Sequence, residues 1–397
     1  MLKYELKILF NQRINKLLIL VLIIIAITFS CFAIFSIHYV DKKGNTNNGF
    51  FASRRLTESK SKYIGPLTPE IIQTVANNQR QITEKYGNKI PEKIYSTGPQ
   101  EYGDILDLCI SILCYNKDFD ESELEKLNIK DFNKIYEIRN SNIVQEIKEY
   151  GTNHMKALYL EEQYSNISIP FYYEPAESWK TMGLYATTYA MILLIAVSFL
   201  SAGIFSREFK LQSNSIFFST KHGRSRGTIT KIACGVITTT LIYWIGMLIL
   251  SVVSFGAMGF SGAKSQIQIE YGYCVYAYTF IQRYLLILLA GYIANLLASV
   301  LSMLVSAKYH SSLLSICFPF IIFIVSPFLE RLFYFKEIFY LTPAHLLNVY
   351  NDIKLTLLYQ FGHLVVLQIP FIIFIYLLVT IILVPLIYIE FSKYYDK

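Results

Sequence analysis

Long apolar blocks alternate with charged stretches along this chain of 397 residues. The first block, residues 17–37, contains no charged side chain. At a rise of ~1.5 Å per residue, a helix of this length can cross a hydrocarbon layer of about 30 Å. Similar blocks recur, and together they predict six spans, at 17–38, 183–205, 232–258, 277–305, 312–329 and 365–391. The pattern predicts an all-α polytopic membrane protein.

The composition agrees with this interpretation. Hydrophobic residues make up 53% of the chain, whereas soluble domains are usually about 45–50% apolar. A cleaved signal peptide is an alternative for the first block, but its apolar run exceeds the ~7–15 residues of a signal sequence. No Ala-x-Ala cleavage site follows it. An uncleaved first span with a basic N-terminus is the better interpretation.

The basic residues near the span ends predict the orientation. They gather at the N-terminus, in the links after the second and fourth spans and at the C-terminus: Lys3, Lys7, Arg13, Lys16, Arg207, Lys210, Lys221, Arg224, Arg226, Lys231, Lys308, Lys393 and Lys397. With six spans, these segments share one side of the membrane. Because short cytoplasmic segments are enriched in Lys and Arg, we expect a multi-pass protein of the cell membrane with both termini cytoplasmic.

Residues 39–182 then form an outer domain, and its pattern is mostly helical. The Thr-Pro-Glu sequence at 68–70 is a helix start, with a capping hydroxyl, a proline in the first turn and an acid near the positive helix end. Further helices are expected over 99–114 and 131–149, with a short one opening at 120–123. The prolines within 169–175 predict an extended connector.

The segment before the first span has an amphipathic pattern. The apolar residues Leu2, Leu6, Leu9, Phe10 and Ile14 fall near one face of a helix, and the lysines fall away from it. Such a helix can lie in the headgroup layer; the alternative is a cytoplasmic extension of the first span. The predicted organisation is therefore 1–38 for the interfacial helix and first span, 39–182 for the outer domain and 183–397 for the other spans.

Cofactor and enzyme motifs are missing from the sequence. It has no Cys-x-x-Cys, no zinc-type Cys/His spacing, no His-Glu-x-x-His and no P-loop. Cys109 and Cys114 are five positions apart in one predicted helix, too far apart for a relaxed disulfide, so buried free thiols are the favoured interpretation and a disulfide the alternative. We expect no metal, no cofactor and no enzymatic activity in this chain, so a partner must supply any ATP hydrolysis.

The middle of each predicted span lacks ionisable residues. Arg283 lies at the outer end of the fourth span, where its side chain is expected to extend to the headgroups. Among the neutral polar residues at depth, Thr239, Asn295 and Ser299 are candidates for lining a substrate path. The alternative for each is a hydrogen bond between helices, the usual role of such residues in membranes.

The link between the second and third spans, residues 206–231, has the most distinctive pattern. It begins with a glutamate at a span exit, continues through a short amphipathic helix and a Thr-Lys-x-Gly-Arg turn, and ends at Lys231; its candidate functional residues are Glu208, Phe209, Phe217, Lys221, Gly223 and Arg224. The link resembles the coupling-helix loop of ABC-2-type transporter permeases, which docks on an ATPase subunit. That resemblance implies that Glu208 pairs with a basic residue of the partner, and Arg224 with acids or lipid phosphates.

The resemblance extends to the topology. ABC-2 permeases have six spans, cytoplasmic termini, an N-terminal interfacial helix and a partly re-entrant stretch between the last two spans, here about 330–364. It implies the permease subunit of an exporter that moves a drug, peptide or lipid-like substrate. Such a chain would dimerise with itself or with a second permease, contact membrane lipids and bind cytoplasmic ATPase subunits that hold ATP and magnesium. No nucleic acid is expected among its partners.

Two other classes stay open. A membrane receptor or sensor would use residues 39–182 to recognise a ligand. A membrane enzyme or ion-coupled carrier is disfavoured, because such proteins need ionisable groups inside the bilayer.

Overall fold

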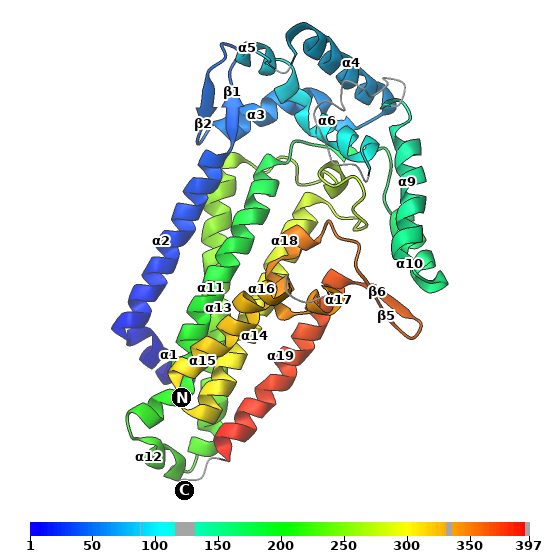
Figure 1. The fold of residues 1–397 in the computed structure, drawn as a ribbon. Coiled ribbons are helices and arrows are strands. Elements are labelled where there is room, and N and C mark those ends of the chain that lie inside the picture. Colours follow the sequence, from blue (N-terminus) through cyan, green and yellow to red (C-terminus); the bar gives the residue numbers. More distant parts are fainter. Residues whose placement is uncertain (88, 116–131, 331–335, 394–397) are drawn as a thin grey trace.

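The computed structural model describes residues 1–87, 89–115, 132–330 and 336–393. Long helices form a bundle, and a smaller, mostly helical domain covers one end of it (Figure 1). The N-terminal helix and the end of the last helix lie together at the opposite end. The short helix predicted at 120–123 lies outside the described residues.

Five helices of the described chain are long and apolar enough to cross a membrane. They are α2 (Arg13–Ser36), α11 (Glu177–Lys210), α13 (Thr228–Met258), α14 (Phe280–Tyr309) and α19 (Gln368–Ser392). The polytopic helical class is therefore confirmed. α11 begins at Glu177, before the span predicted at 183–205, and continues through Glu208.

The segment predicted as the fifth span is shorter and broken. It consists of α15 (Ser312–Phe320), a π-helical turn η4 (Ile321–Val325) and α16 (Ser326–Glu330). Pro319 has no N–H to donate to the preceding turn, and the wider π turn follows it directly. The sixth crossing therefore stays a prediction. The chain nevertheless returns between α14 and α19, since the C-terminal ends of both helices lie at the same end of the bundle (Figure 1).

The stretch before α19 is irregular. It contains α17 (Lys336–Phe339), a 3₁₀ turn η5 (Pro343–Leu347), α18 (Val349–Asp352) and an antiparallel hairpin of β5 (Leu358–Phe361) and β6 (Leu364–Leu367). The backbone break expected near 341–343 is present, with Thr342 before the 3₁₀ turn and Pro343 in its first position. The re-entrant character of this stretch stays a prediction.

The N-terminal helix α1 (Leu2–Asn11) is separate from α2, because the backbone is extended at Gln12. The Asn15 side chain donates from Nδ2 to the Leu9 carbonyl at 2.8 Å, which satisfies one free carbonyl at the end of α1. Leu9 is buried, and Leu2, Leu6 and Phe10 pack beside it. Ile14, predicted on the same face, belongs to α2 and is exposed.

The domain at the far end of the bundle, named the cap domain here, comprises residues 38–176. It contains α3 (Ala52–Lys60), η1 (Ser61–Tyr63), α4 (Pro69–Tyr86), α5 (Glu92–Tyr95), α6 (Pro99–Leu113), α9 (Ile135–Tyr150) and α10 (His154–Ser165). β1 (His38–Val40) and β2 (Thr46–Asn48) form a hairpin, whereas β3 (Gly65–Pro66) pairs antiparallel with the distant β4 (Tyr172–Tyr173). The predicted helix start at Thr68, with a proline in the first turn, and the helices near 99–114 and 131–149 are confirmed. The expected capping hydrogen bond is absent, because the Thr68 side chain accepts none from the first turn of α4. Cys109 and Cys114 are buried and are not joined to each other by a disulfide bond.

The cap domain is completed by the loop between α13 and α14. Arg139 on α9 is buried and donates from Nε to the Gly272 carbonyl at 2.7 Å. Its guanidinium also covers the Phe171 ring, 4.9 Å from the ring centroid. The Tyr273 hydroxyl donates to the Ile112 carbonyl at 2.8 Å. The cap domain is thus fastened to the bundle by a segment more than a hundred positions away in sequence.

The centre of the bundle is the contact between α11 and α14, the two most buried long helices. Small residues line it, and the Ser201 and Ser299 hydroxyls are hydrogen-bonded at 2.6 Å. Small residues allow close helix approach in membranes. At Gly291, an added Cβ would lie 2.6 Å from the Tyr243 hydroxyl, whereas at Gly256 it would meet nothing within 4 Å.

This contrast gives a matched pair of substitutions. Gly291→Leu is expected to destabilise the bundle by about 1–3 kcal/mol, the usual effect of overpacking a filled core. Gly256→Leu adds the same side chain into open space and should change little. The measurement is the temperature at which the detergent-purified protein loses its monodisperse peak, and equal losses in both variants would contradict the packing argument.

Candidate functional site

The helix α11 carries a cluster of paired charges at each end. Glu208 lies in its last turn, beside the link to α13, while Glu177 and Lys180 lie in its first turns, beneath the cap domain. The helix has 34 residues, so it is about 50 Å long. The two charge clusters therefore lie at opposite ends of the bundle.

The cluster at the end beside the termini is centred on Lys231, whose side chain is only 1% exposed. Its Nζ lies 2.6 Å from Glu208 Oε1 and 3.4 Å from Glu5 Oε2, and it donates to the Ile204 carbonyl at 3.2 Å. The lysine therefore joins α1, α11 and α13. A buried cation is tolerated only when it is paired and hydrogen-bonded.

Glu208 is paired within its own chain. Its Oε1 lies 2.6 Å from Lys231 Nζ. Within the described part of the chain, its buried Oε2 has no hydrogen-bond partner. The ion pair joins the end of α11 to the start of α13, and the expected pairing of Glu208 with a basic residue of another subunit stays a prediction.

Aromatic rings fill the space between the link and the helix ends. The short helix α12 (Asn214–Ser219) places Phe217 and Phe218 against Phe391 of α19, with ring centroids 5.8 and 5.1 Å apart. Phe209 of α11 stacks on His310 at the end of α14, with centroids 3.6 Å apart. Phe209 and Phe217 thus have ring contacts within the chain and are partly buried, and their predicted contact with an ATPase stays a prediction.

The turn after α12 is also fixed by internal contacts. Gly223 is buried, and an added Cβ would collide with the Phe217 carbonyl oxygen, so only glycine fits. Arg224 donates from Nη1 to the Ser392 carbonyl at 3.2 Å and from Nε to the Phe218 carbonyl at 3.3 Å. It thereby binds the C-terminal end of α19, where a cation is favourable. Lys221 is exposed.

Substitutions of Lys231 and Glu208 are expected to lower the free energy of unfolding by different amounts. Lys231→Met leaves Glu208 buried without its cation and is expected to destabilise the protein by about 3–5 kcal/mol. Glu208→Gln should have a smaller effect, since the amide oxygen still accepts a hydrogen bond and Lys231 keeps Glu5. The double variant should be less destabilised than the sum of the two.

Thermal unfolding in detergent measures the stability of the two single variants and the double variant. Arg226→Met is the control, since it removes an exposed cation from the same end of the bundle. Additive effects of the two substitutions would show that Lys231 and Glu208 do not interact.

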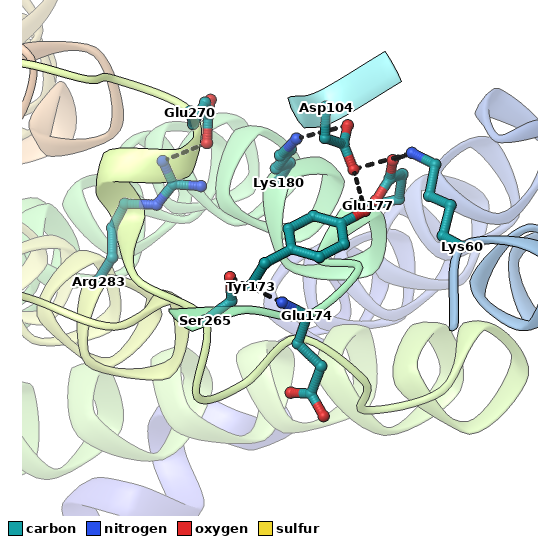
Figure 2. Close-up of polar contacts among 9 residues, drawn as sticks. All are labelled: Lys60, Asp104, Tyr173, Glu174, Glu177, Lys180, Ser265, Glu270 and Arg283. Carbon is teal, nitrogen blue, oxygen red and sulfur yellow. Dashed lines mark hydrogen bonds and ion pairs between the residues drawn. The ribbon is translucent and has the colours of Figure 1, made fainter. Parts of the chain in front are cut away.

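The second cluster joins the cap domain to α11 (Figure 2). Asp104 of α6 accepts from Lys60 Nζ at 2.9 Å and from the Tyr173 hydroxyl at 3.1 Å through Oδ2, and from Lys180 Nζ at 3.3 Å through Oδ1. Lys60 also pairs with Glu177. Four elements, α3, α6, β4 and α11, therefore meet at one buried group of charges.

The charges set the protonation of this cluster. Burial alone would raise the pKa of Asp104, but the ammonium groups of Lys180 and Lys60 lower that pKa well below its usual range. Burial opposes the charge on Lys60, yet Glu177 and Asp104 raise its pKa. Both groups are consequently ionised at neutral pH. Asp107 differs, because partial desolvation and the negative charge of Asp104 raise its pKa.

A second ion pair lies beside this cluster. Arg283 of α14 donates from Nη1 to Glu270 Oε2 at 2.8 Å, and its side chain is 1% exposed. The expectation that Arg283 extends to lipid headgroups is wrong, because the loop between α13 and α14 folds over the helix start and supplies an acid. Figure 2 shows the same loop meeting β4, where the Glu174 amide donates to Ser265 Oγ at 3.2 Å.

A cavity of about 260 Å³ opens beside the Asp104 cluster. Lys60, Tyr95, Asp104, Asp107 and Glu177 are among the residues that line it. Carboxylates outnumber ammonium groups on its wall. In the sequence, this cluster is indicated by Glu177 and Lys180, which lie just before the predicted second span. Lys60 and Asp104 could not be assigned to the cluster from sequence.

Asp104 and Asp107 provide a matched pair of substitutions. Asp104→Asn leaves Lys60 and Lys180 with one anion fewer and is expected to destabilise the protein by about 3 kcal/mol. Asp107→Asn removes a charge that the fold disfavours and should be neutral or stabilising at pH 7. Because the pKa of Asp104 is lowered on folding, its contribution is complete above the ordinary value of 3.8 and is lost only in more acidic solution.

Unfolding of the purified variants at pH 7 tests this ranking. If Asp107 rather than Asp104 anchored the cap domain, Asp107→Asn would be the more destabilising of the two substitutions, which would contradict this prediction.

The residues predicted to line a substrate path lie between helices. Asn295 donates from Nδ2 to the Gly291 and Ala190 carbonyls at 2.8 and 3.2 Å, and Ser299 bonds Ser201. Thr239 is 1% exposed, and its hydroxyl lacks a hydrogen-bond partner within the described residues. Asn295 and Ser299 thus tie α11 to α14, which is the alternative stated from sequence. A path-lining role for the three stays a prediction.

Among the described residues, no group of three or more His, Cys, Asp or Glu side chains is arranged to hold a metal ion. Comparison with known protein families and with curated protein sequences finds no match for this chain. The fold and its two charge clusters therefore define the class of the protein only as a polytopic helical membrane protein with a cap domain.

Proposed function

We propose that this chain is the permease subunit of an ATP-driven ABC exporter, with the link 206–231 as the segment on which a separate ATPase acts. The observation that carries the proposal is the mechanical attachment of α12. The Lys231 cluster holds the two ends of the link, and the phenylalanine contacts join α12 to α19. A force on α12 would move α11, α13 and α19 together.

The exposed side of the link is the docking surface in this proposal. Ile216 on α12 is 69% exposed and Leu211 is 63% exposed, both at the end of the bundle that carries the termini. Lys221 is exposed beside them. Exposed apolar side chains bordered by cations suit a partner groove that is apolar with an acidic rim. Lys221 keeps its expected partner-binding role, and Ile216 replaces Glu208 as the principal contact.

The rest of the proposal follows from the orientation of charges. The positively charged link lies in the cytoplasm, the cap domain lies outside, and a drug, peptide or lipid-like substrate passes between two permease chains. The second permease is an identical or a sister chain. The outward faces of α2 and α19 are the least buried of the long helices and are available for lipids or for that second copy. ATP and magnesium are held by the partner.

The exposed apex of α12 allows a direct test. Ile216→Asp is expected to abolish co-purification with the host's ABC ATPase subunit, because it places a charge at the centre of an apolar contact. Val144→Asp, at a 52% exposed position on the cap domain, is the control and should retain the ATPase. Affinity purification of the tagged, full-length chain from membranes, followed by an ATPase assay, is the measurement. An unchanged complex with Ile216→Asp would overturn the proposal.

A sensor function is the second candidate, and one observation favours it. The 260 Å³ cavity lies against the charge cluster that attaches the cap domain to α11, so a ligand there could displace α11. Ligand binding to the full-length protein without any bound or stimulated ATPase would support this candidate over transport.

A further inference from the structure

A second cavity, of about 220 Å³, lies at the end of the bundle that carries the termini. Its wall is formed by α1, the start of α2, α11, α13 and α15. Its wall includes residues at the two ends of the link 206–231, but the exposed docking residues Leu211, Ile216 and Lys221 do not line it. The side chains of α11 that line the cavity change from charged to apolar along the helix. This change indicates which kind of ligand fits the cavity.

The charged part of the cavity contains Arg207 and Lys210. Neither forms an ion pair with an acid in the described part of the chain, in contrast to Lys231 deeper in the same cavity, which is held by Glu208 and Glu5. Glu5 also lines the cavity but is paired with Lys231, so Arg207 and Lys210 give this part of the cavity a net positive charge that suits a phosphate group. Arg in particular binds phosphate oxygens through two N–H groups.

The apolar part lies about two helical turns away along α11. Phe199 is eight positions before Arg207, or about 12 Å along the helix axis. Phe199, Ile8 and Ile14 line the cavity and are 39%, 38% and 66% exposed, so it opens sideways through apolar residues. Gly203, between the two parts, leaves open space where a side chain would otherwise stand.

We propose that this cavity binds one anionic phospholipid, with its phosphate at Arg207 and Lys210 and an acyl chain along Phe199 and the apolar side of α1. A free phosphate would leave the apolar wall without an occupant, and a zwitterionic lipid would not supply net negative charge to the two cations. The lipid would fix α1 against α11 next to Lys231, and so would support the link. This inference does not depend on the transport proposal.

The test uses full-length, delipidated protein in a non-ionic detergent and measures binding of phosphatidylglycerol by native mass spectrometry, with phosphatidylcholine as the comparison lipid. The double variant Arg207→Ala/Lys210→Ala is expected to weaken phosphatidylglycerol binding about thirtyfold, from the attraction of two cations to anionic lipid. Arg226→Ala/Lys308→Ala removes two exposed cations from the same end and should leave binding unchanged.

A second pair of variants probes the cavity by volume. Both Gly203 and Gly256 have open space at the Cβ position, so a leucine fits at either without a clash. Gly203→Leu fills the cavity and should weaken phosphatidylglycerol binding. Gly256 does not line the cavity, so Gly256→Leu should leave binding unchanged. Glycerol phosphate, which lacks acyl chains, should fail to compete. Equal binding of both lipids, equal losses in the two double variants, or full competition by glycerol phosphate would each overturn the proposal.

Discussion

Buried charge at the two ends of α11 is the constraint on which the rest of this structure depends. A buried ammonium or carboxylate loses its hydration, so it must keep an opposite charge at a fixed distance. Lys231 meets this requirement with Glu208 at one end, and Asp104 meets it with Lys60 and Lys180 at the other. Each cluster fixes which helices are neighbours. The helix between them has no internal proline and packs on α14 along its length.

The bundle has a regular, closely packed part and an irregular part. α11 and α14 meet through small residues and hydrogen bonds, and the Asn295 amide bonds carbonyls on both helices. The segment from α15 to α18 is different, because Pro319 and a π-helical turn interrupt it and short helices follow.

The cap domain is joined to the bundle by buried polar contacts. It is attached through the Asp104 cluster and through Arg139, which bonds Gly272 in the loop between α13 and α14. That loop also supplies Glu270 to Arg283. As a result, the region outside the bundle is built from two distant segments of the chain. The same loop explains why an arginine at a span end is buried instead of reaching the headgroups.

The sequence by itself determined the features that act over one or two helical turns: the long apolar helices, the helix start at Thr68 and Pro69, the break near Pro343 and the short helix within the link 206–231. It did not determine that Glu208 binds Lys231, that Arg283 binds Glu270, or that Lys60 and Asp104 meet 44 positions apart. Hydropathy and capping depend on neighbouring residues, so they can be predicted locally. The partner of a charge depends on which helices pack together, and that is decided only when the whole chain has folded.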